Sequence, residues 1–334
     1  MQHSPSGQYV LQLLKGLQGD KAIGRDWYLL LVRIIRELEF IPCPAEPAVF
    51  IYRSDKDLML VCTSTDDLLC AYSTRRLFQR LVDHLSDYVS VTMKEGSSIT
   101  YLNIRIVQSS DGISYDQTSH IEDTIKRKFF PPARALSLKS VHMPFRTDSQ
   151  FEINLSEELS ASTQDLLHLI RRYGGTYAEI LGYLLHVFVW TRPDLGYSCT
   201  RLGKYTQAPT PSAFAGLYRA VRYLCTHIHR PIFYPRKRIE GYHTIRVDFD
   251  PPKFASIQLP NGLIIAVDAD HGRDLHTRRS CHNFISFMNG VAIDWKTTQQ
   301  KIVSLYSTEA ETRGAADATK RGIFLQSIAD FLEI

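Results

Sequence analysis

The sequence has few features of secreted, disulfide-bonded or zinc-binding proteins. Its six cysteines include no C-x-x-C pair, and they stand at positions 43, 62, 70, 199, 225 and 281. Three of the six lie inside apolar runs, which indicates buried free thiols in a reducing compartment and argues against a zinc site. The opening residues, MQHSPSGQ, lack the charged-then-apolar layout of a targeting segment.

Long hydrophobic runs are also missing. The longest, ILGYLLHVFVW at 180–190, is too short to cross a bilayer and contains a histidine. We therefore expect no membrane partner and a cytoplasmic or nuclear location, with secretion excluded. Charge imbalance is slight, because 39 Lys and Arg against 35 Asp and Glu give a net charge of +4. That balance permits a nucleic-acid partner without requiring one.

The composition that is present is that of ordinary globular domains. Hydrophobic residues make up 44% and charged residues 22% of the 334 positions, which are shares typical of a folded protein. The length is sufficient for two or three domains, and the chain contains no internal repeat and no low-complexity tract. Hydrophobic periodicity predicts a mixed α+β fold.

The first 130 residues are predicted to alternate helices and strands. The hydrophobic patterns predict helices at about 29–38 and 77–85, and strands at 49–52, 58–62, 68–72, 99–107 and 112–116. A capping box of Ser119 and Glu122 would start a further helix that runs to about Phe130.

The later segments differ in texture. Residues 131–160 are rich in Pro and Ser and have no sustained period, which predicts a linker or a long crossing loop. Strands return from about Ile245, and a long amphipathic helix ends the chain. Between them, helices are predicted at about 161–172, 176–190, 196–205 and 212–228.

The stretch TSTDD joins two predicted strands in a tight polar turn that would expose Asp66 and Asp67 at a hairpin tip. Adjacent carboxylates repel each other, so a fold gains from keeping them together mainly when a cation sits between them. Mg²⁺ suits such a tip because it binds few protein carboxylates together with substrate phosphates. A turn with solvated acids is the alternative, and for this stretch taken by itself it is the favoured interpretation.

Several stretches around this turn resemble the reverse transcriptase of copia-type retrotransposons. KGLQGDKAIGRDWY at 15–28 is similar to K-A-L-Y-G-L-K-Q-x-x-R-x-W, EPAVFIY to D-P-C-x-F, STDDLLCA to Y-V-D-D-L-L, and YLNIRI to Y-F-L-G-I-x-I. Further on, YAEILGYLLHVFVWTRPDLGY at 177–197 closely resembles Y-x-x-x-x-G-x-L-x-Y-x-x-x-x-T-R-P-D-I-x-Y, and AVRYLCT is similar to I-L-R-Y-L-x-G-T. These pieces follow the order of the family over most of the chain.

The last segment resembles the RNase H module of the same family. IIAVDADHGRDLHTRRSC is similar to G-Y-x-D-A-D-W-A-G-D-x-x-T-R-R-S-T, and AIDWKTTQQKIVSLYSTEAET to I-S-W-K-S-K-K-Q-x-x-V-A-L-S-S-T-E-A-E-Y. Asp268 ends an apolar strand and Glu311 lies in the opening turns of the final helix. From such positions carboxylates can converge on two Mg²⁺ ions about 3.5–4 Å apart. Asp270 and Glu309 are the neighbouring alternatives, and the resemblance favours Glu311.

The resemblance implies a partial right-hand polymerase palm and thumb, followed by a helical connection and an RNase H-like α/β domain. Fingers and palm would occupy 1–130, the linker and thumb or connection 131–244, and an incomplete RNase H-like domain 245–334. The implied activity is RNA-directed DNA polymerase with RNase H, in which a primer 3′-hydroxyl attacks a nucleotide α-phosphate with the help of two Mg²⁺ ions. The implied partners are RNA template, DNA primer, RNA/DNA hybrid and dNTP. Asp66 would be the principal metal ligand, with Asp67 supporting it.

The resemblance also assigns residues to nucleic acid in three places. The segment with Gly19, Lys21 and Arg25 would line the nucleotide and template side. Gln117 would lie near the primer. A basic run could contact phosphates, with a plain solvated helix face as the alternative, and it consists of Lys126, Arg127 and Lys128.

Two metal-binding positions of the family have no counterpart in the sequence. The first palm carboxylate of the family lies upstream of the K-A-L-Y-G-L stretch, and here MQHSPSGQYVLQLL contains no acid. The next RNase H aspartate lies in a D-N-x-x-A segment beyond the Glu helix, past Ile334. Ser64 also replaces the aromatic residue that precedes D-D. We therefore expect a fragment truncated at both ends and inactive or impaired in catalysis. The alternative is a non-catalytic remnant that binds nucleic acid or a protein.

Overall fold

The structure, a computed structural model, describes residues 2–3, 9–10, 23–131, 138–237, 244–245, 257–258 and 262–333. The chain divides into two compact units, Met1–Lys94 with Ser327–Ile334, and Glu95–Gln326. The mixed α and β character predicted for the chain is confirmed. The polymerase and RNase H folds, and the domain boundaries near residues 130 and 244, stay predictions.

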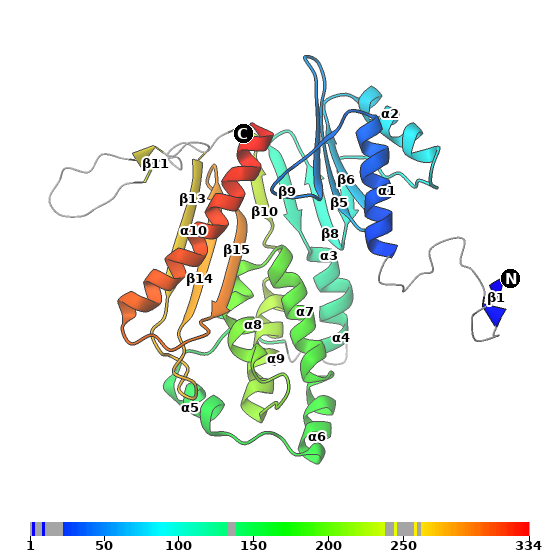
Figure 1. Cartoon of the computed structure of the whole chain (residues 1–334). Helices are drawn as coiled ribbons and strands as arrows, with labels where there is room; N and C mark the ends of the chain where they lie inside the picture. Colours follow the sequence, from blue (N-terminus) through cyan, green and yellow to red (C-terminus); the bar gives the residue numbers. More distant parts are fainter. Residues whose placement is uncertain are drawn as a thin grey trace. The chain divides into compact units, whose positions relative to one another are not determined.

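The first unit contains a four-stranded antiparallel sheet that two helices cover on one face (Figure 1). Met59 and Val61 alternate with less buried neighbours along the third strand, so a single face of the sheet carries the core. Ile34 of the first helix and Leu81 of the second pack into that core. The elements predicted between residues 29 and 85 are confirmed as α1 (Ile23–Glu37), β4 (Val49–Arg53), β5 (Leu58–Ser64), β6 (Asp67–Tyr72) and α2 (Arg75–Ser86). The short strand β3 (Ile41–Pro42) was not predicted.

The second unit begins with another antiparallel sheet, which one strand from far along the chain completes. In the order β10-β9-β8-β7, its strands are β10 (Ile232–Pro235), β9 (Gly112–Asp116), β8 (Ile104–Gln108) and β7 (Ser98–Tyr101). The single strand predicted at 99–107 is wrong, because the chain makes a hairpin at Leu102 and Asn103, with φ of +50° and +64°. A two-residue turn of this kind needs positive φ at both positions. The flanking apolar residues hid it in the sequence.

A helical bundle follows this sheet. Its elements are α3 (Thr118–His120), a π-helical turn η1 (Ile121–Lys126), α4 (Arg127–Phe129), α5 (Ser149–Glu157), α6 (Thr163–Tyr173), α7 (Tyr177–Trp190), a 3₁₀ turn η3 (Pro193–Leu195), α8 (Gly196–Gly203) and α9 (Pro211–Thr226). Helices α6 to α9 confirm the predictions for that segment. Leu184 and Leu217 are fully buried where α7 and α9 meet the rest of the core.

Two local predictions in this part of the chain are wrong. The capping box of Ser119 and Glu122 does not form, since the helix begins after Gln117, and Gln117 makes no side-chain capping bond. The loop or linker predicted at 131–160 is also wrong in part; residues 132–137 of that stretch lie outside the described residues. The stretch contains α5, which Asp148 caps by accepting a hydrogen bond from the Phe151 N–H at 3.0 Å. Nine residues with two buried apolar positions are too short to show a helical period.

The C-terminal part of the second unit is a three-stranded antiparallel sheet with a long helix, and the sheet is called the C-terminal sheet below. Its elements are β13 (Leu263–Ala269), β14 (Cys281–Met288), β15 (Val291–Gln299) and α10 (Ser307–Leu332). The returning strands and the final helix were predicted. Asn289 and Gly290 form the tight turn between β14 and β15, with φ of +51° and +83°.

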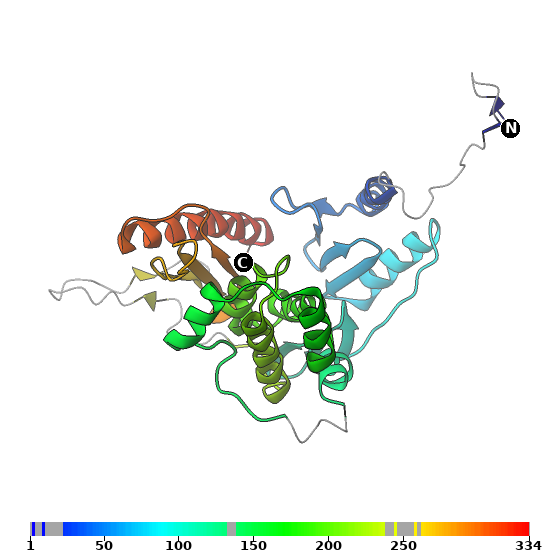
Figure 2. The ribbon, with the colours of Figure 1, turned by 90° about the horizontal axis from the view of Figure 1, so that it is seen from below.

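The two faces of the C-terminal sheet meet different helices (Figure 2). A Cβ on Gly314 would lie 3.2 Å from the Cβ of His282, so α10 lies directly on one face. On the other face the Trp295 indole N–H donates to the Phe188 carbonyl at 2.7 Å, and the Thr200 hydroxyl donates to the Thr297 carbonyl at 3.0 Å. Helices α7 and α8 therefore hold the face opposite to α10.

Short strands complete the described backbone. β1 (Gln2–His3) pairs with β2 (Tyr9–Val10), and β11 (Thr244–Ile245) pairs with β12 (Ile257–Gln258). All six cysteines are free thiols, as predicted, although Cys62 is exposed and Cys70 is half-buried. Among the helices of the described residues, none combines the length and the hydropathy that crossing a membrane requires.

Candidate functional site

The first candidate site is the tip of the β5–β6 hairpin. Thr65 and Asp66 form its two-residue turn, with φ of +53° at Thr65, and Ser64 pairs with Asp67 where the strands begin. The side chains of Asp66 and Asp67 are both exposed. The Trp27 indole N–H donates to the Thr65 carbonyl at 2.8 Å and so fixes the turn to helix α1. The structure thus places the aspartate pair at an exposed tip.

The residues assigned to the nucleotide side are only partly covered by the structure. Gly19 and Lys21 lie outside the described residues. Arg25 is exposed in the first turn of α1, two residues before Trp27, on the helix that contacts the hairpin turn. Its assignment to nucleic acid stays a prediction.

The second candidate site lies at the end of β13, within the second unit. Asp268 and Glu311 are both exposed, and the Ala269 N–H donates to Glu311 Oε1 at 3.3 Å. The Glu311 carboxylate therefore lies beside the residue that follows Asp268. Because side chains alternate along a strand, Val267 and Ala269 face α10 while Asp268 faces the other side. An ion shared by both carboxylates would have to sit at the edge of the strand.

The two alternative carboxylates have structural partners. Glu309 accepts the Leu305 N–H at 2.8 Å and two hydrogen bonds from Arg313, at 3.2 and 2.7 Å, which hold the pKa of Glu309 below its ordinary value. Asp270 accepts the Cys281 N–H at 2.5 Å, while its Oδ2 is buried without a partner among the described residues. Burial raises the pKa of Asp270. Of the four acids, Asp268 and Glu311 are the exposed pair.

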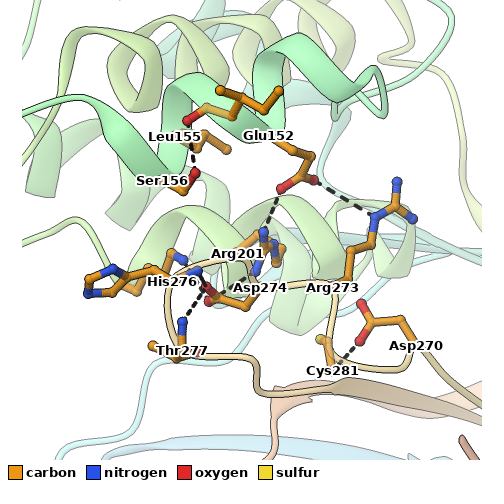
Figure 3. Close-up of polar contacts among 12 residues, drawn as sticks. Glu152, Leu155, Ser156, Arg201, Asp270, Arg273, Asp274, His276, Thr277 and Cys281 are labelled. Atoms are coloured by element: carbon orange, nitrogen blue, oxygen red, sulfur yellow. Dashed lines mark hydrogen bonds and ion pairs between the residues drawn. The ribbon is translucent and has the colours of Figure 1, made fainter.

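The turn that follows Asp268 is anchored by a buried ionic network (Figure 3). Asp274 is 1% exposed and accepts a hydrogen bond from Lys204 at 2.6 Å, with Arg201 at 3.1 Å. Arg201 also donates to Glu152 at 2.6 Å, and the Thr277 N–H donates to Asp274 at 3.1 Å. Burial by itself would raise the pKa of Asp274, but Lys204 and the Thr277 N–H hold it well below the usual range. Helices α5 and α8 therefore fix the position of this turn.

No role had been predicted for Asp274, although the residue stands in the D-A-D-H-G-R-D stretch. A usable signal does exist in the sequence. An aspartate can close a tight turn by accepting the backbone N–H groups two and three residues later, as Asp274 does from His276 and Thr277, and a buried aspartate requires cations nearby. Arg201 and Lys204, spaced three apart on a predicted helix, are such cations. Their meeting with Asp274 depends on tertiary packing, which sequence spacing does not show.

Gln117 lies inside the molecule in this structure. It is 2% exposed, and its Oε1 accepts the Thr191 hydroxyl at 2.8 Å. Its Nε2 is buried and has no hydrogen-bond partner within the described part of the chain. The side chain joins the start of α3 to the end of α7. The predicted role near a primer stays a prediction, and it would require this amide to become accessible.

The basic run that ends the α3–α4 helix is largely paired. Arg127 forms an ion pair with Asp123 at 2.8 Å, one helical turn away. Lys128 forms an ion pair with Glu179, whose hydrogen bond raises the pKa of Lys128, and lies over the Tyr183 ring. Lys126 is half-buried. The alternative of a plain helix face therefore has structural support for Arg127 and Lys128, and their phosphate contacts stay predictions.

The TRPD stretch at 191–194 stabilises the fold through hydrogen bonds of its polar side chains. Arg192, 2% exposed, donates to Asp194 at 2.9 and 2.7 Å and to the His227 carbonyl at 2.8 Å. Asp194 also accepts the Tyr223 hydroxyl at 2.7 Å. Burial by itself would raise the pKa of Asp194, but the Arg192 hydrogen bonds hold it below its ordinary value. The stretch ties the end of α7 to the end of α9.

Both exposed pairs could hold only part of a two-metal site. Mg²⁺ is commonly bound by one or two carboxylates together with water and substrate phosphates, which fits each pair. Within residues 23–131, 138–237 and 262–333, no three His, Cys, Asp or Glu side chains converge in a way that could hold a metal ion. The donors fit Mg²⁺, but each pair needs further ligands from substrate or solvent.

Comparison with known proteins points to retroelements. The chain is 25% identical to the retrovirus-related Pol polyprotein from transposon RE2 of Arabidopsis thaliana over 312 residues, which cover 93% of the chain and 19% of that protein. It is 24% identical to that of transposon RE1 of the same plant over 327 residues, 98% of the chain and 20% of the relative. The polyprotein from transposon TNT 1-94 of Nicotiana tabacum is 23% identical over 329 residues, with 95% and 22% covered.

The chain thus spans about a fifth of the length of these relatives. No family model matches it, and no solved structure matches it. The distant homology to retrotransposon Pol polyproteins supports a retroelement-derived protein.

Proposed function

We propose that the chain is the reverse transcriptase and RNase H part of a copia-type retroelement Pol polyprotein. In this proposal it binds primer–template and RNA/DNA hybrid, and its own residues support catalysis poorly. The observation that carries the proposal is the hairpin tip, where Asp66 and Asp67 are exposed and fixed to α1 through Trp27. The ordered resemblance and the distant homology to Pol polyproteins agree with it.

The proposed chemistry is phosphoryl transfer at two places. Asp66, supported by Asp67, would hold Mg²⁺ where a primer 3′-hydroxyl attacks a nucleotide α-phosphate. Asp268 and Glu311 would hold Mg²⁺ where the RNA strand of a hybrid is hydrolysed. When bound, the metal supplies charge stabilisation to the phosphate oxygens. The residues of this chain contribute exposed carboxylates on fixed supports: a tight turn in the first unit and a strand end in the second.

Impaired catalysis follows from the small number of ligands. Two-metal phosphoryl transfer needs carboxylates that clamp both the attacking and the leaving oxygen. Among the described residues, no group of three His, Cys, Asp or Glu side chains could hold a metal ion, so neither pair gains a third ligand from them. The same observation favours a second function, a non-catalytic element-derived module that binds nucleic acid.

Primer extension tests the proposal. The chain is incubated with a DNA-primed RNA template, dNTPs and Mg²⁺, and wild type is compared with Asp66→Asn. Asp55→Asn, an exposed aspartate in another turn of the same unit, is the control. We expect primer–template binding in all three proteins and little extension in any. Robust extension by wild type that is lost only in Asp66→Asn would contradict the proposed impairment of catalysis. Absence of primer–template binding would contradict the proposed function as a whole.

A further inference from the structure

A group of cations lies on helix α9 and on the segment that leads into α5. Arg219 and Arg222 stand three residues apart on α9, so they share one side of that helix. Arg146 and the exposed Lys139 belong to residues 138–148, just before α5. Asp148 forms an ion pair with Arg146 through two hydrogen bonds, at 2.8 and 2.9 Å. Four cations and this one carboxylate leave a local excess of positive charge.

The arginines on α9 bond to neutral groups. Arg219 Nε donates to the Met143 carbonyl at 3.1 Å, and an Arg222 terminal nitrogen donates to the Lys139 carbonyl at 2.8 Å. A guanidinium has five N–H donors, so each arginine keeps further donors on its terminal nitrogens and its full charge, although the Nε of Arg222 is buried without a partner in the described part of the chain. Burial lowers the pKa of Arg219, and the charges of Arg146 and Arg222 lower it further. Like charges are thus held close together at this surface.

The cluster adjoins the turn that follows Asp268. The Phe145 ring lies 5.1 Å from the Tyr197 ring, with Arg146 next in the chain. The Arg146 guanidinium lies 5.1 Å from the centre of the Phe151 ring, and the next residue of α5, Glu152, forms an ion pair with Arg273 at 3.9 Å. Arg273 and Asp270 belong to the turn between β13 and β14. The cations and the carboxylates of the second candidate site therefore lie on neighbouring parts of one compact unit.

We propose that the four cations Lys139, Arg146, Arg219 and Arg222 form a surface that binds the phosphate backbone of the RNA/DNA hybrid that Asp268 and Glu311 would address. This inference rests on the proposed function and adds to it a second surface that holds the hybrid. A duplex carries about one negative charge per 1.7 Å of its axis, so several neighbouring phosphates can meet several close cations. The planar guanidinium matches the geometry of phosphate oxygens, and Arg219 and Arg222, which bond to backbone carbonyls, spare their charge for it. Arg146, paired with Asp148, adds to the positive potential of the same surface.

The test measures hybrid binding as a function of salt. A fluorescein-labelled RNA/DNA hybrid is titrated by anisotropy with the full chain and with the double variant Arg219→Gln/Arg222→Gln. Each lost phosphate contact lowers the slope of log K against log salt by about one, so the double variant should lower it by about two. Affinity at about 0.1 M salt should fall roughly tenfold or more. Arg80→Gln, which removes one exposed charge on helix α2 of the first unit, should leave the slope unchanged.

Two further variants separate charge from folding, because Arg219 and Arg222 also hold the segment before α5. Arg219→Lys/Arg222→Lys keeps both charges and should retain nearly the wild-type slope. Lys139→Gln removes a charge whose side chain holds no part of that segment, and should lower the slope by about one. Equal slopes for wild type and a folded double Gln variant, or equal losses in the Gln and Lys variants, would overturn this inference alone. Failure of wild type to bind the hybrid would overturn it together with the proposed function.

Discussion

The two exposed carboxylate pairs are built in opposite ways. Asp66 and Asp67 are adjacent in sequence, and a two-residue turn with one hydrogen bond from Trp27 is enough to present them. Asp268 and Glu311 come from a strand and a helix, and the position of Glu311 beside Ala269, the residue after Asp268, depends on α10 lying on the C-terminal sheet. The first pair is therefore a local feature and the second a product of packing. Mutations far from the carboxylates should therefore disturb the second pair and leave the first pair unchanged.

The largest expected effect comes from breaking the ionic network under the second pair. Asp274→Asn removes one charge from a buried cluster and leaves Arg201 and Lys204 without that counterion, which should destabilise the second unit by about 3 kcal/mol or more. Hydrogen exchange of β13–β15 amides should accelerate roughly a hundredfold, while β4–β6 amides stay unchanged. Asp66→Asn is the matched control. Less than a threefold change in β14 would show that the network does not hold this sheet.

The same variant should lose its effect in acid. The pKa of Asp274 is lower in the folded protein than in the unfolded chain, where aspartate titrates near about 3.9. Its stabilisation is therefore fully present above about pH 4 and declines as pH falls toward the folded value. The difference in stability between wild type and Asp274→Asn should shrink below about pH 4. A difference that stays constant down to pH 3 would contradict the assigned pKa direction.

A moderate effect is expected where the C-terminal sheet meets the helical bundle. Trp295→Phe keeps an aromatic ring but removes the N–H that donates to the Phe188 carbonyl, so it should destabilise the second unit by about 1–2 kcal/mol. Trp190→Phe, on helix α7, is the control for aromatic truncation. The measurement is the hydrogen-exchange rate of the β15 amides, which should rise in Trp295→Phe. If both variants behave alike, the indole hydrogen bond contributes nothing specific.

A smaller effect of opposite sign is expected at the first pair. Thr65 is β-branched and holds φ at +53°, a conformation that glycine adopts without strain. Thr65→Gly should stabilise the β5–β6 hairpin by up to about 1 kcal/mol, and Thr65→Asn by less. Exchange rates of β5 and β6 amides provide the measurement. Destabilisation by glycine would mean that the threonine side chain has a role that its backbone angle does not explain.

The smallest effect should come from the aspartates themselves. Asp66→Asn and Asp67→Asn change exposed side chains, so the free energy of unfolding should shift by less than about 0.5 kcal/mol. Thermal denaturation of each variant checks this. A clear loss of stability in either would indicate that the pair serves the fold instead of a ligand.

Local patterns allowed most helices and strands of both units to be predicted. Helices with a long apolar period, such as α2 and α9, have the expected type and approximate bounds. Errors arose where a local signal was weak or hidden. Leu102 and Asn103 turn the chain inside an apolar run, and α5 has too few turns for its period to show. A positive φ at a leucine is not readable from its residue type.

The candidate sites show the same division. The exposed hairpin tip with Asp66 could be predicted because a turn between two strands is a local property. The burial of Gln117 could not be predicted, since its partner, the Thr191 hydroxyl at the end of α7, lies 74 positions further along the chain. Likewise, the TRPD stretch closely resembles the family sequence, yet Arg192 and Asp194 form hydrogen bonds with each other, and Asp194 accepts a further one from Tyr223 of α9. A resemblance identifies residues, but tertiary contacts decide what those residues do.

The most direct test of the account is whether the full chain retains an RNA/DNA hybrid at low salt. Phosphate contacts are strongest there, and affinity should then fall linearly in log K against log salt. The account predicts clear retention at about 25 mM salt and steep loss by about 200 mM. No retention at the lowest salt, with the protein folded by circular dichroism, would contradict it.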